Sequence, residues 1–118
     1  SVPGEIVIDS KYEFYDFAAK YLDDATTLTI PADIDPEMSR EIQAMAQEAF
    51  IALGCEGLAR VDFFLTAEGL LINEVNTMPG FTPTSMYPRL WDASGVPYKE
   101  LISILIDEAL ARPTTILR

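Results

Sequence analysis

The stretch LARVDFFLTAEGLLINEVN, residues 58–76, has the composition and spacing of a β-hairpin. Its two arms, 58–65 and 70–76, are rich in apolar, β-branched and aromatic residues, as strands are. The intervening Gly69 can adopt the left-handed backbone that a three-residue hairpin loop requires. Because strand side chains alternate between two faces, this loop length fixes which residues share a face. The predicted pairs are Thr66 with Leu70, Phe64 with Ile72, Asp62 with Glu74, and Arg60 with Asn76.

One of these pairs places two carboxylates directly opposite each other, and like charges at such positions repel. A divalent cation between Asp62 and Glu74 would remove this repulsion, and Asn76 would supply a third oxygen on the same face. Oxygen ligands that leave coordination positions open for water and phosphate are typical of Mg²⁺ sites. The alternative is an ion pair in which Arg60 neutralises one acid while the other reaches solvent. The alternation of residues leaves both interpretations open.

The overall composition narrows the class of partner and of metal. The 118 residues include 19 acidic and 8 basic side chains, a net charge of −11, which disfavours nucleic acid or an anionic membrane as a partner. Histidine is absent and Cys55 is the only cysteine, so any metal would be a hard cation held by oxygen. No stretch approaches the roughly 18 apolar residues of a membrane span, and a lone cysteine fits a reducing cytoplasm.

Helix and strand signals elsewhere in the chain predict an α+β fold. Residues 36–53 predict a helix that Asp35 caps and Gly54 ends. The antiparallel hairpin is expected to pack against this helix and against a last helix at about 97–112, since both have an apolar stripe at helical spacing. The remaining predicted elements are a strand at 5–9, a long loop at about 11–35 with an extended stretch at 26–31, and a short helix at about 86–93.

A loop rich in proline and hydroxyl groups, NTMPGFTPTS at residues 76–85, follows the acidic strand. The segment GLARVDFFLTAEGLLINEVNTMPGFTPTSMYP, 57–88, resembles the carboxy-terminal core of the D-alanine–D-alanine ligases, ATP-grasp enzymes of bacterial cell-wall synthesis. That family has an R-x-D strand, an E-x-N strand and a T-x-P-G-x-T-x-x-S loop. The matching residues are Arg60, Asp62, Glu74, Asn76, Thr77, Pro79, Gly80, Thr82 and Ser85. Upstream, FYDFAAKYLDD at 14–24 resembles the family's lid segment.

The resemblance implies an enzyme that joins two D-alanines for peptidoglycan: ATP phosphorylates the first carboxylate, and the second amine attacks the resulting acyl phosphate. It implies that Asp62, Glu74 and Asn76 bind two Mg²⁺ (or Mn²⁺) ions that hold the ATP phosphates. Arg60, helped by the Gly80 N–H, would stabilise the phosphoryl group and the tetrahedral oxyanion. The other implied roles are Ser85 and the Met86 N–H for the second D-alanine's carboxylate, Lys20 for the phosphates, Tyr21 for lid closure, and Phe64 and Phe14 for adenine.

The resemblance covers nearly the whole chain and predicts that residues 1–118 form a C-terminal ATP-grasp subdomain, with its lid at about 11–35 and its metal and substrate residues within 58–88. The amino-terminal domain and most of the central domain are then expected to be missing, so this piece alone should be inactive. The full protein is expected to be a cytoplasmic homodimer that binds D-alanine and ATP. Two alternatives remain: another ATP-grasp ligase, such as one joining D-alanine to D-lactate, and a non-catalytic acidic interaction domain.

Overall fold

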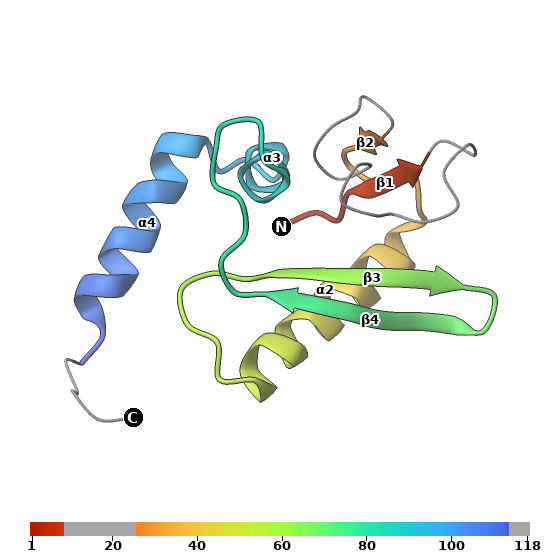
Figure 1. Cartoon of the computed structure of the whole chain (residues 1–118), viewed down its shortest axis with the longest axis horizontal. Helices are drawn as coiled ribbons and strands as arrows, with labels where there is room; N and C mark the ends of the chain where they lie inside the picture. The colour runs from red at the N-terminus through yellow and green to blue at the C-terminus, as the bar shows by residue number, and fades with distance from the viewer. Residues whose placement is uncertain (9–25, 114–118) are drawn as a thin grey trace.

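The computed structural model describes residues 1–8 and 26–113 (Figure 1). Its elements, in chain order, are strands β1 (Glu5–Ile8) and β2 (Thr26–Thr29), helix α2 (Pro36–Ala52), strands β3 (Arg60–Thr66) and β4 (Gly69–Asn76), and helices α3 (Met86–Ala93) and α4 (Tyr98–Ala111). The predicted bounds agree with these to within two residues at each end. Among the described helices, none combines the length and the apolar character needed to cross a bilayer.

Helix α2 begins and ends where its sequence indicates. The Asp35 Oδ1 atom accepts hydrogen bonds from the N–H groups of Glu37 and Met38, both at 2.9 Å, and so satisfies two donors of the first turn. Gly54 follows the helix with a φ of 63°, a left-handed conformation that glycine adopts without steric cost. The helix runs across one face of the β3–β4 hairpin and contacts both strands (Figure 1). It therefore forms the layer on which the hairpin rests.

The register of the hairpin confirms the prediction at one end and corrects it at the other. The pairs at the open end are Arg60 with Asn76, Val61 with Val75, and Asp62 with Glu74. The pairs near the turn are Phe63 with Ile72, Phe64 with Leu71, Leu65 with Leu70, and Thr66 with Gly69. The predicted partners of Thr66 and Phe64 are thus wrong by one residue. The turn is tighter than predicted because the Thr66 hydroxyl donates to the Gly69 carbonyl at 3.0 Å and accepts the Glu68 N–H at 3.2 Å.

A β-bulge in β4 accounts for the difference in register between the two ends of the hairpin. The register shifts between Asp62 and Phe63, which makes Asn73 the surplus residue of β4. Had the ladder continued from the tight turn without a bulge, Asn73 would lie opposite Asp62, and Glu74 would turn to the other face. The bulge therefore returns Glu74 to the face that carries Asp62.

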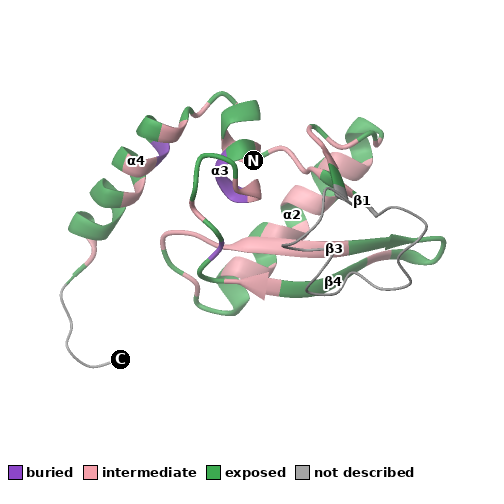
Figure 2. Ribbon diagram, turned by 45° about the horizontal axis from the view of Figure 1, so that its top comes forward, coloured by how far each residue is buried: buried purple, intermediate pink, exposed green. Residues whose placement is uncertain are grey.

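The most buried side chains gather around α3 and not under the hairpin (Figure 2). Tyr87 and Leu101 are 7% and 2% exposed, and Pro88 is fully buried. Pro79, from the loop between β4 and α3, is also buried. Helix α4 packs mainly on α3, whereas the hairpin packs on α2. The predicted α+β arrangement is therefore present, but α4 serves chiefly as the support of α3 rather than of the hairpin.

The amino-terminal residues tie a second antiparallel pair, β1–β2, to α3. The Val2 N–H donates to the Ser94 hydroxyl at 2.8 Å. A Cβ atom on Gly4 would lie 2.7 Å from the Leu90 side chain, so only glycine allows the chain to pass this close to α3. Strand β2 falls inside the predicted lid at 11–35, and residues 9–25 of the chain lie outside the described residues.

Candidate active site

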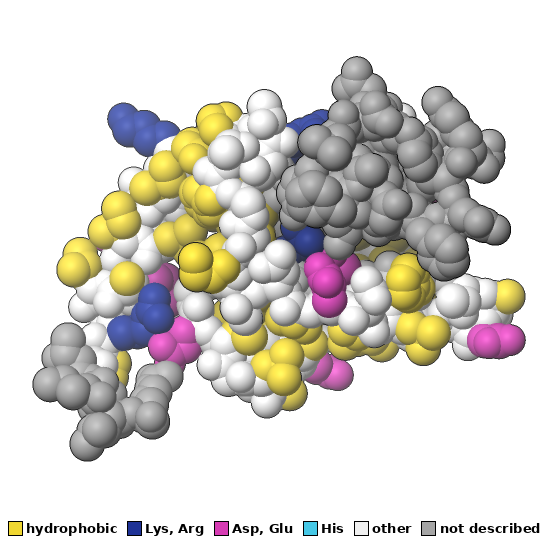
Figure 3. Space-filling view, in the orientation of Figure 1, with side chains coloured by type: hydrophobic (Ala, Val, Ile, Leu, Met, Phe, Trp, Pro, Cys, Tyr) yellow, Lys and Arg dark blue, Asp and Glu magenta, His cyan; other side chains and the backbone are white. Residues whose placement is uncertain are grey.

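One face of the hairpin carries three charged side chains and one amide, here called the acidic face: Arg60, Asp62, Glu74 and Asn76. The Arg60 guanidinium binds Asp62 through two hydrogen bonds, Nε to Oδ1 at 2.7 Å and Nη2 to Oδ2 at 2.8 Å. The same Nη2 lies 3.4 Å from Glu74 Oε1. Acidic and basic side chains adjoin over the middle of the hairpin in the space-filling view (Figure 3). The ion pair that the sequence left as an alternative is therefore present.

The two carboxylates of the acidic face differ in solvent exposure. The Asp62 side chain is 21% exposed and bound at both oxygens, whereas the Glu74 side chain is 44% exposed and has one long contact to Arg60. Bidentate arginine–carboxylate contacts are the stronger kind, so Arg60 compensates Asp62 far better than Glu74. Glu74 is consequently the acid more available to an added cation.

The oxygens of the acidic face suit a hard cation. Within residues 1–8 and 26–113, no three histidine, cysteine or carboxylate groups gather as a ready metal cage. The donors are instead two carboxylates and the Asn76 amide, whose Oδ1 already accepts the Met78 N–H at 3.1 Å. An amide oxygen has two lone pairs and can accept a second contact. So small a set leaves coordination positions open, as Mg²⁺ sites shared with phosphates do.

The loop that follows β4 is fixed by aromatic residues from both later helices. The Phe81 ring packs against Tyr87 and Tyr98, with ring centroids 5.7 and 5.5 Å apart. The Tyr98 hydroxyl donates to the Phe81 carbonyl at 2.6 Å. Burial raises the pKa of Tyr87 above its ordinary value. These contacts hold the loop in place at Phe81.

The far end of this loop brings three hydroxyl groups together. Ser85 Oγ lies 2.8 Å from Thr82 Oγ1 and accepts the Thr82 N–H at 3.1 Å. Thr84 Oγ1 lies 3.2 Å from Thr82 Oγ1. A Cβ atom on Gly80 would lie 3.0 Å from Ser85 Oγ, so only glycine fits this close to the hydroxyl without displacing it. The predicted pair Gly80 and Ser85 therefore lies side by side.

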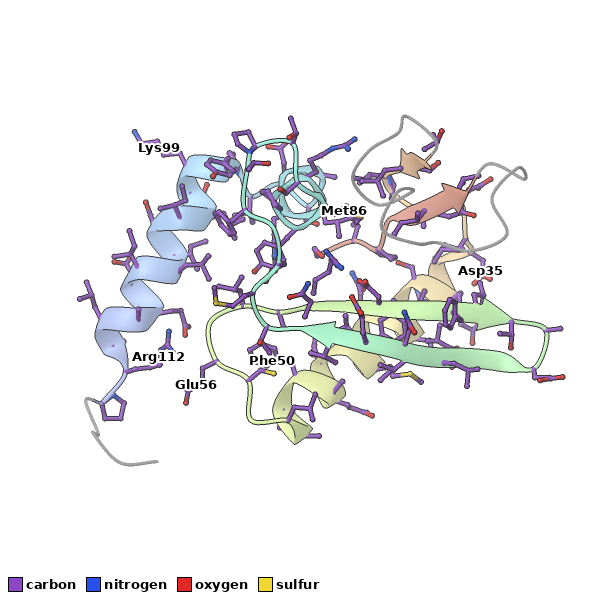
Figure 4. The ribbon with its side chains drawn as sticks, viewed as in Figure 1. Asp35, Phe50, Glu56, Met86, Lys99 and Arg112 are labelled. Atoms are coloured by element: carbon purple, nitrogen blue, oxygen red, sulfur yellow. The ribbon has the colours of Figure 1, made fainter. Side chains whose placement is uncertain are left out.

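Two residues of the acidic face, Arg60 and Asp62, border an open cleft of about 1230 Å³ together with the start of α3. Its lining includes Arg60, Asp62 and Phe64 from β3 and Met86 from α3. Figure 4 shows Met86 at α3, above the hairpin. Phe64, predicted to contact adenine, is 57% exposed near the tip of the hairpin, opposite Leu71. The predicted residues Phe14, Lys20 and Tyr21 lie outside the described residues.

We expect the substitution Tyr98→Phe in the full-length protein to loosen the loop without unfolding it. The ring keeps its packing on Phe81, but the Phe81 carbonyl loses its donor, at a cost of about 1 kcal/mol in the free energy of unfolding. Urea denaturation would measure this loss. Ser103→Ala is a matched control, because its hydroxyl donates only to Lys99 within the same helix. Equal stability of the two variants would contradict the anchoring role of Tyr98.

Comparison with known proteins shows which family has this sequence and fold. The family described as D-ala D-ala ligase C-terminus matches residues 1–107. The chain belongs to this family. The D-alanine–D-alanine ligase of Mycolicibacterium smegmatis is 57% identical over 101 residues, which cover 86% of this chain and 27% of that protein. The chain thus spans about a quarter of the length of such relatives.

Solved structures of D-alanine ligases have the same fold. The VanG D-Ala:D-Ser ligase of Enterococcus faecalis matches with a TM-score of 0.75 and 39% identity, over 88% of this chain and 30% of that one. The D-alanine–D-alanine ligase of Bacillus anthracis complexed with ATP matches with a TM-score of 0.74 and 26% identity, over 92% of this chain and 34% of that one. The α+β ATP-grasp fold expected from the motif of the D-alanine–D-alanine ligases is therefore confirmed.

Two features of this ligase family member were not foreseen from its sequence. The Tyr98 hydroxyl bond to the loop joins residues 17 positions apart, and no local pattern marks such a contact. The bulge at Asn73 was also missed. A polar residue interrupting an apolar strand next to an acid was the available signal, because bulges often occur beside active sites.

Proposed function

We propose that the full-length protein containing this chain is an ATP-dependent D-alanine–D-alanine ligase that forms ADP and the dipeptide for peptidoglycan. One observation carries the proposal: the register of the hairpin gathers Arg60, Asp62, Glu74 and Asn76 on one face, directly before the loop that holds Gly80 and Ser85. The identity to ligase relatives along most of the chain supports it.

The metal ligands in this proposal are Asp62, Glu74 and Asn76. Their oxygens fit one or two Mg²⁺ ions, and the exposure of Glu74 suits it to lie between two cations. When bound, Mg²⁺ neutralises charge on the ATP phosphates during transfer. Arg60 would exchange its contact with Asp62 for the transferred phosphoryl group and later for the oxyanion of the tetrahedral intermediate.

The residues that hold the amino-acid substrates in this proposal follow β4. The Gly80 N–H would add to the stabilisation of the oxyanion, and the Ser85 hydroxyl with the Met86 N–H would bind the carboxylate of the second D-alanine. The Phe81 contacts with Tyr87 and Tyr98 support this, since a fixed backbone keeps donors in place before the substrate arrives. The amine of the second D-alanine would then attack the acyl phosphate formed on the first, which forms the peptide bond, breaks the acyl C–O bond and releases inorganic phosphate and a proton.

Further parts of the proposal concern the lid, the adenine contacts and the properties of the whole protein. Lys20 would bind the ATP phosphates and Tyr21 would close the lid over substrate, while Phe64 and Phe14 would contact adenine. We propose that residues 1–118 are the C-terminal ATP-grasp subdomain of a cytoplasmic homodimer and have no activity alone.

A second candidate differs only in the second substrate. The structural likeness to a D-Ala:D-Ser ligase raises D-serine as an alternative, and D-lactate is a further one. A segment at 14–24 with Lys20 and Tyr21 and without histidine favours D-alanine. A competition experiment would separate these possibilities. The full-length enzyme is given D-alanine together with D-serine or D-lactate, and the products are identified by mass.

The experiment that tests the proposal measures ADP release and dipeptide formation by the full-length protein with ATP, Mg²⁺ and D-alanine. We expect ADP and D-alanyl-D-alanine in equal amounts, no product when Mg²⁺ is chelated, and none from L-alanine. A non-catalytic acidic interaction domain would release no ADP under any of these conditions. That result would contradict the proposed function.

A further inference from the structure

The Ser85 hydroxyl does not do what a serine at the start of a helix ordinarily does. Serine at this position usually caps the helix by accepting the N–H of the second or third helical residue. The side chain of Ser85 makes no capping bond to α3. One reason lies in the sequence, because the third helical residue is Pro88 and has no N–H to offer. The hydroxyl is instead held by Thr82, through both its side chain and its backbone.

The count of protons in this cluster limits what the Ser85 hydroxyl can do. A hydroxyl has one proton to donate and two lone pairs to accept with, and the Thr82 N–H uses one of the Ser85 lone pairs. The contact between the two hydroxyls at 2.8 Å can run in either direction. A carboxylate only accepts, so Ser85 can donate to one only if Thr82 donates to Ser85. Thr84, at 3.2 Å, can in turn donate to Thr82.

We propose that Thr82 is a positioning residue that directs the proton of Ser85 toward the carboxylate of the second amino-acid substrate. The inference rests on the proposed function and adds a specificity-determining residue to it. The chain of donors runs from Thr84 to Thr82 to Ser85 and ends on the carboxylate, and each bond in such a chain strengthens the next. Gly80 has no side chain to obstruct this hydroxyl, since a Cβ atom there would lie 3.0 Å from Ser85 Oγ.

The test uses Thr82→Val in the full-length enzyme, which replaces the hydroxyl with a methyl group of similar size and keeps the backbone N–H. We expect the KM for the second D-alanine to rise roughly 3- to 10-fold, the range for one lost hydrogen bond, while the KM for ATP and the melting temperature stay unchanged. Thr82→Ser should restore the KM to within about 2-fold, because it returns the hydroxyl. Ser103→Ala is the control, because it removes a hydroxyl that donates to the Lys99 carbonyl within α4, and it should change neither KM.

A double-mutant cycle decides whether Thr82 acts through Ser85. Ser85→Ala removes the group that Thr82 directs, so adding Thr82→Val to it should cause no further rise in KM. Three results would overturn the inference while leaving a working ligase. The first is a double mutant whose rise in KM is the product of the two single rises. The others are an unchanged KM in Thr82→Val and a failure of Thr82→Ser to restore the KM. A wild-type enzyme that releases no ADP with D-alanine would overturn the proposed function, and the inference with it.

Discussion

Replacing Glu74 by glutamine in the full-length protein is expected to lower kcat by on the order of 10²-fold and to raise the Mg²⁺ concentration needed for half-maximal activity. Glutamine keeps the shape of the side chain but removes the negative charge that a cation needs. Glu74 is the more exposed and less compensated of the two acids, so its charge is free to act on an added ion. Steady-state kinetics over a Mg²⁺ titration would measure both quantities.

The control for Glu74→Gln lies in the same hairpin. Glu68→Gln removes one charge from the exposed turn, away from the acidic face, and should leave both kcat and the Mg²⁺ requirement unchanged. If Glu74→Gln folds normally and keeps the parental kcat and ATP KM, the assignment of Glu74 to a metal site is wrong.

Replacing Arg60 by glutamine is expected to lower kcat by roughly 10²- to 10³-fold, the usual cost of removing one group that stabilises developing negative charge. A second effect follows from the ion pair. Without Arg60, the carboxylates of Asp62 and Glu74 face each other uncompensated, so the melting temperature should fall in a chelating buffer. Added Mg²⁺ should recover most of that loss, because a cation between the acids replaces the missing positive charge. Thermal unfolding with and without Mg²⁺ would measure this.

A second arginine–glutamate pair provides the comparison for Arg60. Arg112, at the end of α4, contacts Glu56 at 3.1 Å, and Figure 4 shows the two at the opposite side of the molecule from β1. Arg112→Gln should leave kcat unchanged, and any loss in melting temperature should not respond to Mg²⁺. If Arg60→Gln behaves in the same way as Arg112→Gln, Arg60 forms a structural ion pair and nothing more.

The parts of the fold that were predictable from sequence are those set by neighbouring residues. The limits of α2 follow from the Asp35 cap and from Gly54, and both act within one turn of the helix. The open end of the hairpin was also predictable, because alternation places Arg60, Asp62, Glu74 and Asn76 on one face. Predictions of this kind rest on local geometry, which the structure retains.

The parts that sequence did not predict depend on choices between states of similar energy or on distant contacts. The segment TAEG accommodates a two- or a three-residue turn, and the hydroxyl of Thr66 decides in favour of the shorter one. The support of the loop by Tyr98 comes from a helix that starts more than ten residues later in the chain. The lid residues Lys20 and Tyr21 remain predictions, since they lie outside the described residues.

The bulge at Asn73 separates the hairpin into two halves that can change length independently. Deleting Asn73 would straighten the ladder and leave the pairs Asp62–Glu74 and Arg60–Asn76 as they are, because the pairs near the turn would simply continue into them. Moving the surplus residue from the bulge into the turn would also preserve these two pairs, and only the partners of the tip residues would change. The tip of this hairpin can therefore gain or lose a residue during evolution while the charged residues keep their partners.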